Sequence, residues 1–260
     1  MAPGTDPDPH DPYSRLAYRR LIAWPERLRR EAPFLEAVAA TGPERSVLDL
    51  GCGSGEHAHY FAEQGYRVLG IDVSAAQIAL ARETAGPAHV RFEVGDMTRL
   101  EETTKERFGT ALTLGNSLVH LLDSEALEAA CRGVHVALLS GGAWMVQILN
   151  YERLRARSER ALPVNVRPGD GEEIVFLRLL RLLPGGMVEF IPVTLSLQPE
   201  TEPPVRLVSS RVVPHRGWTR EEIAPVLERA GFVAVEWCGD MQGGPFDPLG
   251  SSDLVFVARR

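Results

Sequence analysis

The stretch Val47-Leu48-Asp49-Leu50-Gly51-Cys52-Gly53-Ser54-Gly55, with Ile71-Asp72 downstream, decides the fold. An apolar run passes directly into three closely spaced glycines, which let a ligand lie against the main chain because they have no β-carbon. Asp72 follows the first glycine by about 20 residues, at the end of a second apolar run, where a carboxylate accepts hydrogen bonds from both ribose hydroxyls. This order of strand, glycine turn and distant acid predicts a nucleoside-binding unit.

The spacing of the glycines and the charge beside them separate two classes of nucleoside ligand. A dinucleotide loop reads G-x-G-x-x-G and directs helix-end amides at a pyrophosphate. Here the third glycine comes one residue early, and Asp49 precedes the first. A carboxylate at that position would repel a pyrophosphate, but it attracts an ammonium or sulfonium by roughly 4 kcal/mol at about 4 Å. S-adenosylmethionine carries both of these cationic groups and is the predicted cofactor.

Asp49, Gly51, Gly53 and Gly55 match residue by residue the D-x-G-x-G-x-G motif of the class I S-adenosylmethionine-dependent methyltransferases, which the chain resembles over roughly residues 44–150. The resemblance implies that Asp96 hydrogen-bonds the adenine amino group and that the amide of Met97 meets a ring nitrogen. The implied cofactor-binding set is Asp49, Gly51, Gly53, Gly55, Asp72, Val73, Asp96, Met97, Leu114, Asn116 and His120.

The run Leu114-Gly115-Asn116-Ser117-Leu118-Val119-His120-Leu121 resembles, more locally, the glycine and sarcosine N-methyltransferase branch of that family. A similar run there lines the methionine end of the cofactor. The branch contains enzymes of small molecules, so the resemblance implies a small-molecule acceptor without identifying it.

Composition and charge limit the partners. The chain has 260 residues, 44% of them hydrophobic, which predicts one α/β domain with an insertion. Its 35 acidic and 28 basic side chains give a net charge of −7, which disfavours nucleic acid. The proline-rich start resembles no signal peptide, and no apolar stretch approaches the ~20 residues that span a bilayer. We expect no membrane partner, and the sequence leaves monomer and homo-oligomer open.

The three cysteines, Cys52, Cys131 and Cys238, stand singly without a C-x-x-C pair. This spacing predicts neither a disulfide framework nor a metal site. We therefore expect a reducing, cytoplasmic location.

Hydrophobic periodicity predicts alternating strands and helices, and hence an α/β, Rossmann-like, doubly wound sheet of seven mostly parallel strands. The predicted strands are 46–50, 67–71, 89–94, 110–114, 143–149, 233–238 and 254–258. The predicted helices cover 56–64 and 125–139, and two more begin with capping boxes at Ser74 and Thr219.

Three long β-favouring runs, 174–183, 187–197 and 205–213, interrupt this rhythm and predict an antiparallel insertion or lid. Near the N-terminus, Pro25 and Pro33 divide an apolar helical pattern and predict short helices joined by bends. The expected organisation is a disordered tail at 1–12, an N-terminal helical cap at 13–43, a cofactor-binding domain at 44–150 and 217–260, and a β-rich lid at 151–216.

Two histidines are candidates for acid–base chemistry, because the reference pKa of the imidazole lies close to neutrality. His120 follows the fourth predicted strand, and His215 lies where the predicted lid returns to the sheet. A role in orienting the cofactor or capping a helix is the alternative for His120. The candidate substrate residues are Tyr13, Tyr18, Trp24, Asn150, Tyr151 and Arg178.

Two further sequence features bear on the substrate. Asn150-Tyr151 lacks the prolines of the N-P-P-Y type motif of enzymes that methylate nucleic-acid amino groups, so base flipping is disfavoured. The arginines near the N-terminus, Arg27 and Arg29 among them, are candidates for binding an anionic substrate or the cofactor carboxylate.

The expected function is SN2 transfer of a methyl group from S-adenosylmethionine to a nitrogen or oxygen atom of a small molecule. Alignment of donor and acceptor would contribute more than acid–base chemistry, since effective molarity supplies on the order of 7–11 kcal/mol. The alternatives are a non-catalytic S-adenosylmethionine sensor or partner subunit and, less favoured by Asp49, a nucleotide oxidoreductase.

Overall fold

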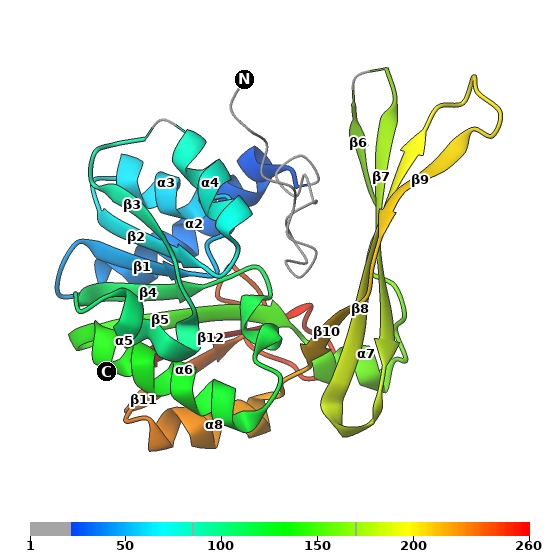
Figure 1. Cartoon of the computed structure of the whole chain (residues 1–260). Helices are drawn as coiled ribbons and strands as arrows, with labels where there is room; N and C mark the ends of the chain where they lie inside the picture. The colour runs from blue at the N-terminus through cyan, green and yellow to red at the C-terminus, as the bar shows by residue number, and fades with distance from the viewer. Residues whose placement is uncertain (1–21, 85, 170) are drawn as a thin grey trace.

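The computed structural model describes residues 22–84, 86–169 and 171–260, which form two β-sheets (Figure 1). The larger sheet has seven strands in the order β3-β2-β1-β4-β5-β12-β11, and β12 runs in the direction opposite to the other six. This confirms the predicted fold class. The strands are β1 (Ser46–Leu50), β2 (Arg67–Asp72), β3 (Val90–Val94), β4 (Phe108–Thr113), β5 (Leu138–Leu149), β11 (Ala234–Cys238) and β12 (Asp253–Arg259).

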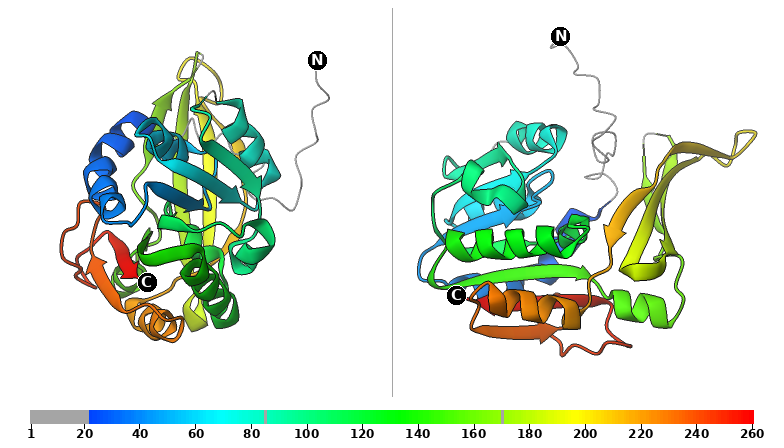
Figure 2. Two further views of the ribbon diagram at one scale, coloured as in Figure 1. Left: turned by 90° about the vertical axis from the view of Figure 1, so that its left-hand side faces the viewer. Right: turned by 60° about the horizontal axis from the view of Figure 1, so that its bottom comes forward.

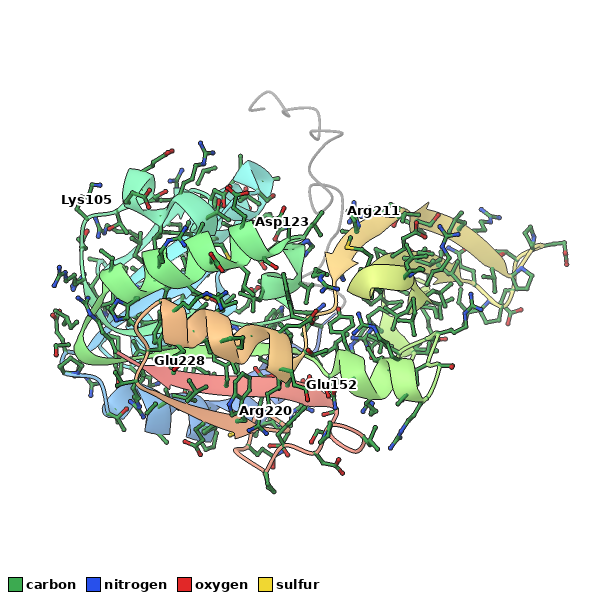
Figure 3. The ribbon with its side chains drawn as sticks, turned by 90° about the horizontal axis from the view of Figure 1, so that it is seen from below. Lys105, Asp123, Glu152, Arg211, Arg220 and Glu228 are labelled. Carbon is green, nitrogen blue, oxygen red and sulfur yellow. The ribbon has the colours of Figure 1, made fainter. Side chains whose placement is uncertain are left out.

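Helices cover both faces of this sheet and divide the core into two layers. Side chains alternate along each strand, so that Val47 of β1 packs into one layer and Leu48 and Leu50 pack into the other. One layer holds α2 (Trp24–Ala40), α3 (Glu56–Glu63) and α4 (Ala75–Glu83). The other holds α5 (Leu100–Thr103), α6 (Ser124–Ala137) and α8 (Arg220–Arg229), and Figure 3 shows α6 and α8 in front of the sheet.

Side-chain caps fix where these helices begin. Thr219 and Glu222 form the predicted reciprocal capping box at the start of α8. Ser74 caps α4 by accepting a hydrogen bond from the amide of Gln77, while its own amide donates to Asp72 Oδ1. The amide of Arg220 donates to Glu152, so α8 begins beside α7 (Tyr151–Ala156), as the two labelled residues in Figure 3 show.

The prediction of short N-terminal helices was wrong for residues 24–40, because α2 is one continuous helix of 17 residues. Pro25 lies in its first turn, where the missing N–H has no intrahelical partner to lose. Pro33 lies inside the helix and removes one hydrogen bond there. Burial of Leu35, Val38 and Ala39 in the core compensates for that loss.

The second sheet is antiparallel, and the β7–β8 hairpin turns through Pro184–Gly186 as predicted. The predicted third strand is instead two strands that pair with the same edge of β8. In β8, Val193 faces Ser210 of β9 and Phe190 faces Val213 of β10, so both strands pair with β8 in the same register. The gap between them lies at Pro192, which has no N–H to donate. The strands are β6 (Asn165–Pro168), β7 (Glu173–Leu182), β8 (Met187–Leu197), β9 (Val205–Ser210) and β10 (Val213–Arg216).

The second sheet rises beside one end of the seven-stranded sheet, as the two views of Figure 2 show. β5 ends at Leu149 and leads through α7 into this second sheet, so the end in question carries the carboxyl termini of the parallel strands. The order of the strands reverses between β1 and β4, where such sheets place their ligands. Among the described helices, none has the length and apolarity that a bilayer crossing requires.

Candidate functional site

A cavity of about 1920 Å³ opens at the carboxyl ends of β1, β2 and β4 and extends to β7, β8 and β10 of the second sheet. It therefore lies at the point where the strand order reverses. Ten of the eleven predicted cofactor-binding residues line it. They are Asp49, Gly51, Gly53, Asp72, Val73, Asp96, Met97, Leu114, Asn116 and His120.

The first two glycines of the motif bring bare backbone to the cavity. Gly51 has φ +69°, and a β-carbon on it would stand 2.6 Å from Ser117 Oγ. Gly53 has φ +55°, and a β-carbon there would enter open space, with the nearest atom, Gln77 Oε1, 3.9 Å away. A side chain at Gly53 would thus occupy room in the cavity, which is the arrangement expected where a ligand lies on the main chain.

Gly55 does not line the cavity, and its surroundings indicate a packing role, while its contact with the cofactor stays a prediction. It caps α3 with φ +85°, and a β-carbon would stand 2.8 Å from the ring of Phe92 and 3.1 Å from Ala81. A glycine is needed at this third position because α3 begins close against β3 and α4. From the sequence motif alone, this packing requirement looks the same as a requirement for ligand contact.

Asp49 and Asp72 form an acidic wall of the cavity. Asp49 is 2% exposed, and its Oδ2 has no hydrogen-bond partner among the described residues. Burial raises the pKa of Asp49 to about 7, and the carboxylates of Asp72 and Glu56 add to the rise. Asp72 accepts hydrogen bonds from the amides of Gly53 (2.9 Å) and Ser74 (2.9 Å). It therefore holds the glycine turn as well as facing the cavity.

The next loop presents Asp96 and Met97. Asp96 Oδ1 accepts hydrogen bonds from the amide and the hydroxyl of Thr98, both at 2.8 Å, which fixes the carboxylate at the cavity edge. Val73 is 68% exposed although it is apolar, and Met97 is partly buried against the core. Both side chains contribute apolar surface to the cavity that Asp72 and Asp96 also line, which suits a planar base.

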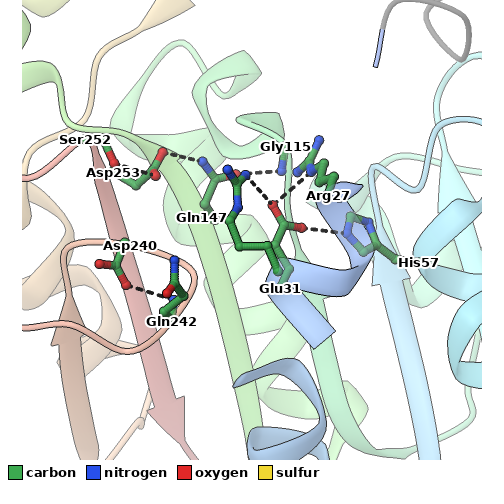
Figure 4. A network of polar contacts seen from close by, with 10 residues as sticks. Arg27, Glu31, His57, Gly115, Gln147, Asp240, Gln242, Ser252 and Asp253 are labelled. Carbon is green, nitrogen blue, oxygen red and sulfur yellow. Dashed lines mark hydrogen bonds and ion pairs between the residues drawn. The ribbon is translucent and has the colours of Figure 1, made fainter. Parts of the chain in front are cut away.

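A second wall of the cavity comes from α2 and carries Glu26, Arg27, Arg30 and Glu31. Arg27 and Arg30 line the cavity beside the buried Glu31, whose Oε1 lies 2.9 Å from Arg27 Nε and 3.8 Å from Arg30 Nη2. Glu31 Oε2 lies 3.1 Å from His57 Nε2 on α3 (Figure 4). Arg29, by contrast, is exposed and does not line the cavity, so of the two arginines considered only Arg27 is placed to bind an anion there.

A chain of amide contacts holds the loop after β4 (Figure 4). The amide of Gly115 donates to Gln147 Oε1 (2.9 Å), and Gln147 Nε2 donates to Asp253 Oδ1 (2.7 Å). Asn116 adopts φ +71° and accepts a hydrogen bond from the amide of Leu149. The sequence analysis missed Gln147 and Asp253, and the one available signal was a glutamine inside an otherwise apolar strand.

His120 and His215 meet at the seam between the two sheets. Their ring centroids are 4.7 Å apart at 85°, and Phe190 stacks on His215 at 5.0 Å and 14°. Burial lowers the pKa of His120 to about 4 and that of His215 to about 3. Both rings are thus neutral at pH 7 and weakly basic, which corrects the expectation of a near-neutral general base. His215 is 2% exposed, and neither ring nitrogen has a partner among the described residues.

The predicted substrate residues divide into three groups. Trp24 and Arg178 line the cavity. Asn150 and Tyr151 do not line it: Asn150 is 1% exposed and caps α7, and the hydroxyl of Tyr151 accepts a hydrogen bond from Asn116 Nδ2. Tyr13 and Tyr18 lie outside the described residues.

The carboxylates that line the cavity favour a nucleoside ligand that carries positive charge. The unpartnered Asp49 oxygen and the neighbouring Asp72 would repel a pyrophosphate, whereas a cation would stabilise both carboxylates. The open space at Gly53 leaves room for the ligand against the main chain. Within 22–84, 86–169 and 171–260, no three His, Cys, Asp or Glu side chains are grouped to hold a metal ion.

Known proteins with similar sequences and structures are methyltransferases. A family model described as a methyltransferase domain matches residues 47–142. A glycine/sarcosine N-methyltransferase of Parasynechococcus marenigrum (strain WH8102) is 29% identical over 137 residues, 52% of this chain and 49% of the relative. A ubiquinone biosynthesis O-methyltransferase of Bradyrhizobium sp. (strain ORS 278) is 34% identical over 136 residues, 52% of this chain and 50% of the relative. The chain thus spans about half the length of these curated relatives.

A solved structure extends the similarity of fold to nearly the whole chain. It is that of S-adenosylmethionine-bound CalS10, an amino pentose methyltransferase from Micromonospora echinaspora involved in calicheamicin biosynthesis. The TM-score is 0.72 at 22% sequence identity, and the match covers 94% of this chain and 95% of that one. The second sheet is therefore part of a fold that occurs elsewhere.

Proposed function

Because the chain belongs to the class I S-adenosylmethionine-dependent methyltransferase family, we propose that it transfers a methyl group from S-adenosylmethionine to a nitrogen or oxygen atom of a small molecule. The observation that carries the proposal is Asp49, a buried carboxylate whose Oδ2 has no partner among the described residues, in a cavity at the reversal of strand order. A cationic ligand would satisfy it.

The two walls of the cavity support one orientation of the cofactor. The acidic wall would take the ammonium at Asp49 and the ribose hydroxyls at Asp72, and Asp96 with Met97 would take the adenine. On the wall from α2, Arg27 would take the carboxylate, because a guanidinium binds carboxylates through two donors. Leu114, Asn116 and His120 would then surround the methionine end.

When bound, S-adenosylmethionine supplies a methyl group already activated by a positively charged sulfur. The chain's own contribution is to hold the acceptor in line with that methyl and to exclude water. Apolar side chains of the second sheet and the segment before it, among them Leu162, Phe176 and Phe190, line the acceptor half of the cavity and are suited to exclusion of water. This β-rich segment, 151–216, is thus proposed as the wall or lid over the acceptor.

The histidines bear on the class of acceptor. A hydroxyl acceptor needs a base whose pKa lies near the working pH, whereas an amine can lose its proton in solution before it binds. His120 and His215 have pKa values of about 4 and about 3, which makes both of them poor bases at neutral pH. We therefore favour an amine over a hydroxyl, with His120 and His215 as neutral hydrogen-bonding groups that hold it.

The proposal is tested first by binding. Isothermal calorimetry should detect S-adenosylhomocysteine and no NAD, and Asp49→Ala should weaken the binding of S-adenosylhomocysteine by 10-fold or more. Glu63→Ala, which removes an exposed acid from α3 outside the cavity, is the matched control and should bind as the wild type does. Absence of heat with S-adenosylhomocysteine would refute the proposal.

Turnover then separates an enzyme from a sensor. Release of S-adenosylhomocysteine should depend on an acceptor when small amines, hydroxyls and carboxylates are supplied as a panel, with the amines active. Cofactor binding without acceptor-dependent release across that panel would instead support a non-catalytic sensor or partner subunit.

A further inference from the structure

Glu31 is a buried charge that none of the proposed chemical steps uses. It is 3% exposed on α2, within the wall that carries Arg27. A buried carboxylate is costly unless it is paired and hydrogen-bonded, and this one contacts both Arg27 and His57. The question is what this arrangement does for the cavity.

The contact with Glu31 fixes how Arg27 faces the cavity. Arg27 uses Nε for Glu31 Oε1 at 2.9 Å, which leaves the two terminal nitrogens of the guanidinium to point elsewhere. One of them, Nη2, lies 3.9 Å from the position a β-carbon would take on Gly115, at the end of β4. The Trp24 ring lies 4.9 Å from Arg27 Cζ on another side. The guanidinium is therefore held at its Nε edge by Glu31, as Figure 4 shows, and Arg27 is one of the residues that line the cavity.

His57 holds the other oxygen of the same carboxylate. Its Nε2 lies 3.1 Å from Glu31 Oε2, and its ring meets Trp24 edge to face at 5.4 Å. Burial lowers the pKa of His57, so the ring is neutral and donates a single N–H to Glu31. His57 lies in the first turn of α3, directly after the glycine turn. Through His57, Glu31 thus joins α2 to the start of α3, directly after the glycine turn that brings bare backbone to the cavity.

Glu31 is ionised in this group. Burial alone would raise the pKa of Glu31, but the hydrogen bond from His57 and the charge of Arg27 outweigh it and hold that pKa below its usual value. Glu31 therefore offsets one of the two guanidiniums beside it, and Glu26 of the same helix also lines the cavity. The contact with Glu31 uses only Nε of Arg27, so an anionic group of the ligand can still bind at the terminal nitrogens despite these carboxylates.

We propose that Glu31 and His57 are positioning residues, which hold the Arg27 guanidinium in the orientation that binds the carboxylate of the cofactor's amino-acid end. The proposal rests on the proposed function, because it presumes that S-adenosylmethionine occupies the cavity. Its distinctive consequence is selectivity: loss of Glu31 or His57 should weaken only ligands that carry the carboxylate.

The experiment compares two ligands by isothermal calorimetry, S-adenosylhomocysteine and its decarboxylated analogue, which lacks only that carboxylate. Wild-type protein should prefer S-adenosylhomocysteine, and Arg27→Met should abolish the preference. Glu31→Gln and His57→Leu should each weaken S-adenosylhomocysteine by about 10-fold and leave the analogue within about two-fold. His57→Gln, whose amide can replace the Nε2 donor, should restore most of the affinity. Arg29→Met, an exposed neighbour on the same helix, is the control.

The outcomes distinguish the possible failures. Equal weakening of both ligands in Glu31→Gln would show that Glu31 only joins α2 to α3, and the proposal would fall. Unchanged binding of both ligands would refute it equally. If wild-type protein bound neither ligand, the proposed function itself would be wrong, which is a separate result. Thermal melting of each variant identifies any that does not fold, and in that case Glu31→Asp serves as the second substitution at that position.

Discussion

The rings of His120 and His215 lie 4.7 Å apart and nearly perpendicular, one on the segment after β4 and the other on β10. Two neutral imidazoles, His215 buried and His120 partly buried, therefore join the segment after β4 to the second sheet. Protonation of either ring would be unfavourable, because burial disfavours the charged form and is the main cause of both lowered pKa values.

This contact should make the protein sensitive to acid. Both pKa values are lowered in the folded state, so below the ordinary value of 6.5 the unfolded chain takes up these protons first and stability falls as the pH falls. Each ring should cost roughly 2 kcal/mol between pH 7 and pH 5. Urea unfolding of His215→Leu should show a smaller loss over that range than wild-type protein. An equal loss in both would contradict this account.

The ionisation of Asp49 should change stability with pH in the opposite direction. Its pKa is raised to about 7 in the folded state, so its cost to stability grows as the pH rises from about 4 to 7. Without ligand, Asp49→Asn should therefore stabilise the protein by roughly 2–4 kcal/mol at pH 8 and have little effect at pH 4. The same variant should bind S-adenosylhomocysteine more weakly. Thermal melting at both pH values, with calorimetry, checks the pair of effects, and lower stability at pH 8 would refute the assignment.

Asp72 has two functions that substitution can separate. Its carboxylate receives the amides of Gly53 and Ser74 and is proposed to receive the ribose hydroxyls. Asp72→Ala should weaken cofactor binding by about 10-fold or more, since charge-assisted hydrogen bonds are lost. Thr219→Ala, which removes the cap of α8 outside the cavity, should cost about 1 kcal/mol of stability and leave affinity nearly unchanged. Equal losses of affinity in the two variants would contradict the ribose contact.

The second and third glycines of the motif should respond differently to alanine. Gly53→Ala would place a methyl in open cavity at φ +55°, so it should lower stability by about 1–2 kcal/mol and strongly weaken cofactor binding. Gly55→Ala would strike the ring of Phe92 at φ +85° and should lower stability more, by about 2–4 kcal/mol. Melting and calorimetry on both variants make the comparison. A greater loss of stability in Gly53→Ala than in Gly55→Ala would contradict these assignments.

The sequence predicted well those features that are determined by residues close together in the chain. The predicted strand 46–50 matches β1, and the turn after it reaches the cavity as predicted, because strand, glycine and acid are neighbours in the chain. The capping box at Thr219 was equally local. Gly55 shows the limit of this approach, since its closest contact, Phe92, comes from another strand.

The sequence was a poor guide where distant segments meet. Glu31, Gln147 and Asp253 were missed because each acquires its partner only through the tertiary fold. Asn150 does not line the cavity, because a polar residue at a strand end can turn toward the core as well as toward the ligand. Its side-chain amide donates to the carbonyls of Asp247, Pro248 and Ser251.

The same Asn150 contacts bear on how the molecule could be altered. They fix the first crossing, where the chain leaves the seven-stranded sheet after β5. Arg155 fixes the second crossing, where the chain returns after β10, by donating to the carbonyls of Gly186 and Gly217. Any bending of the second sheet must therefore occur beyond these two crossings. β6 and β9 lie beyond both crossings, so substitutions in these two strands leave the contacts of Asn150 and Arg155 in place.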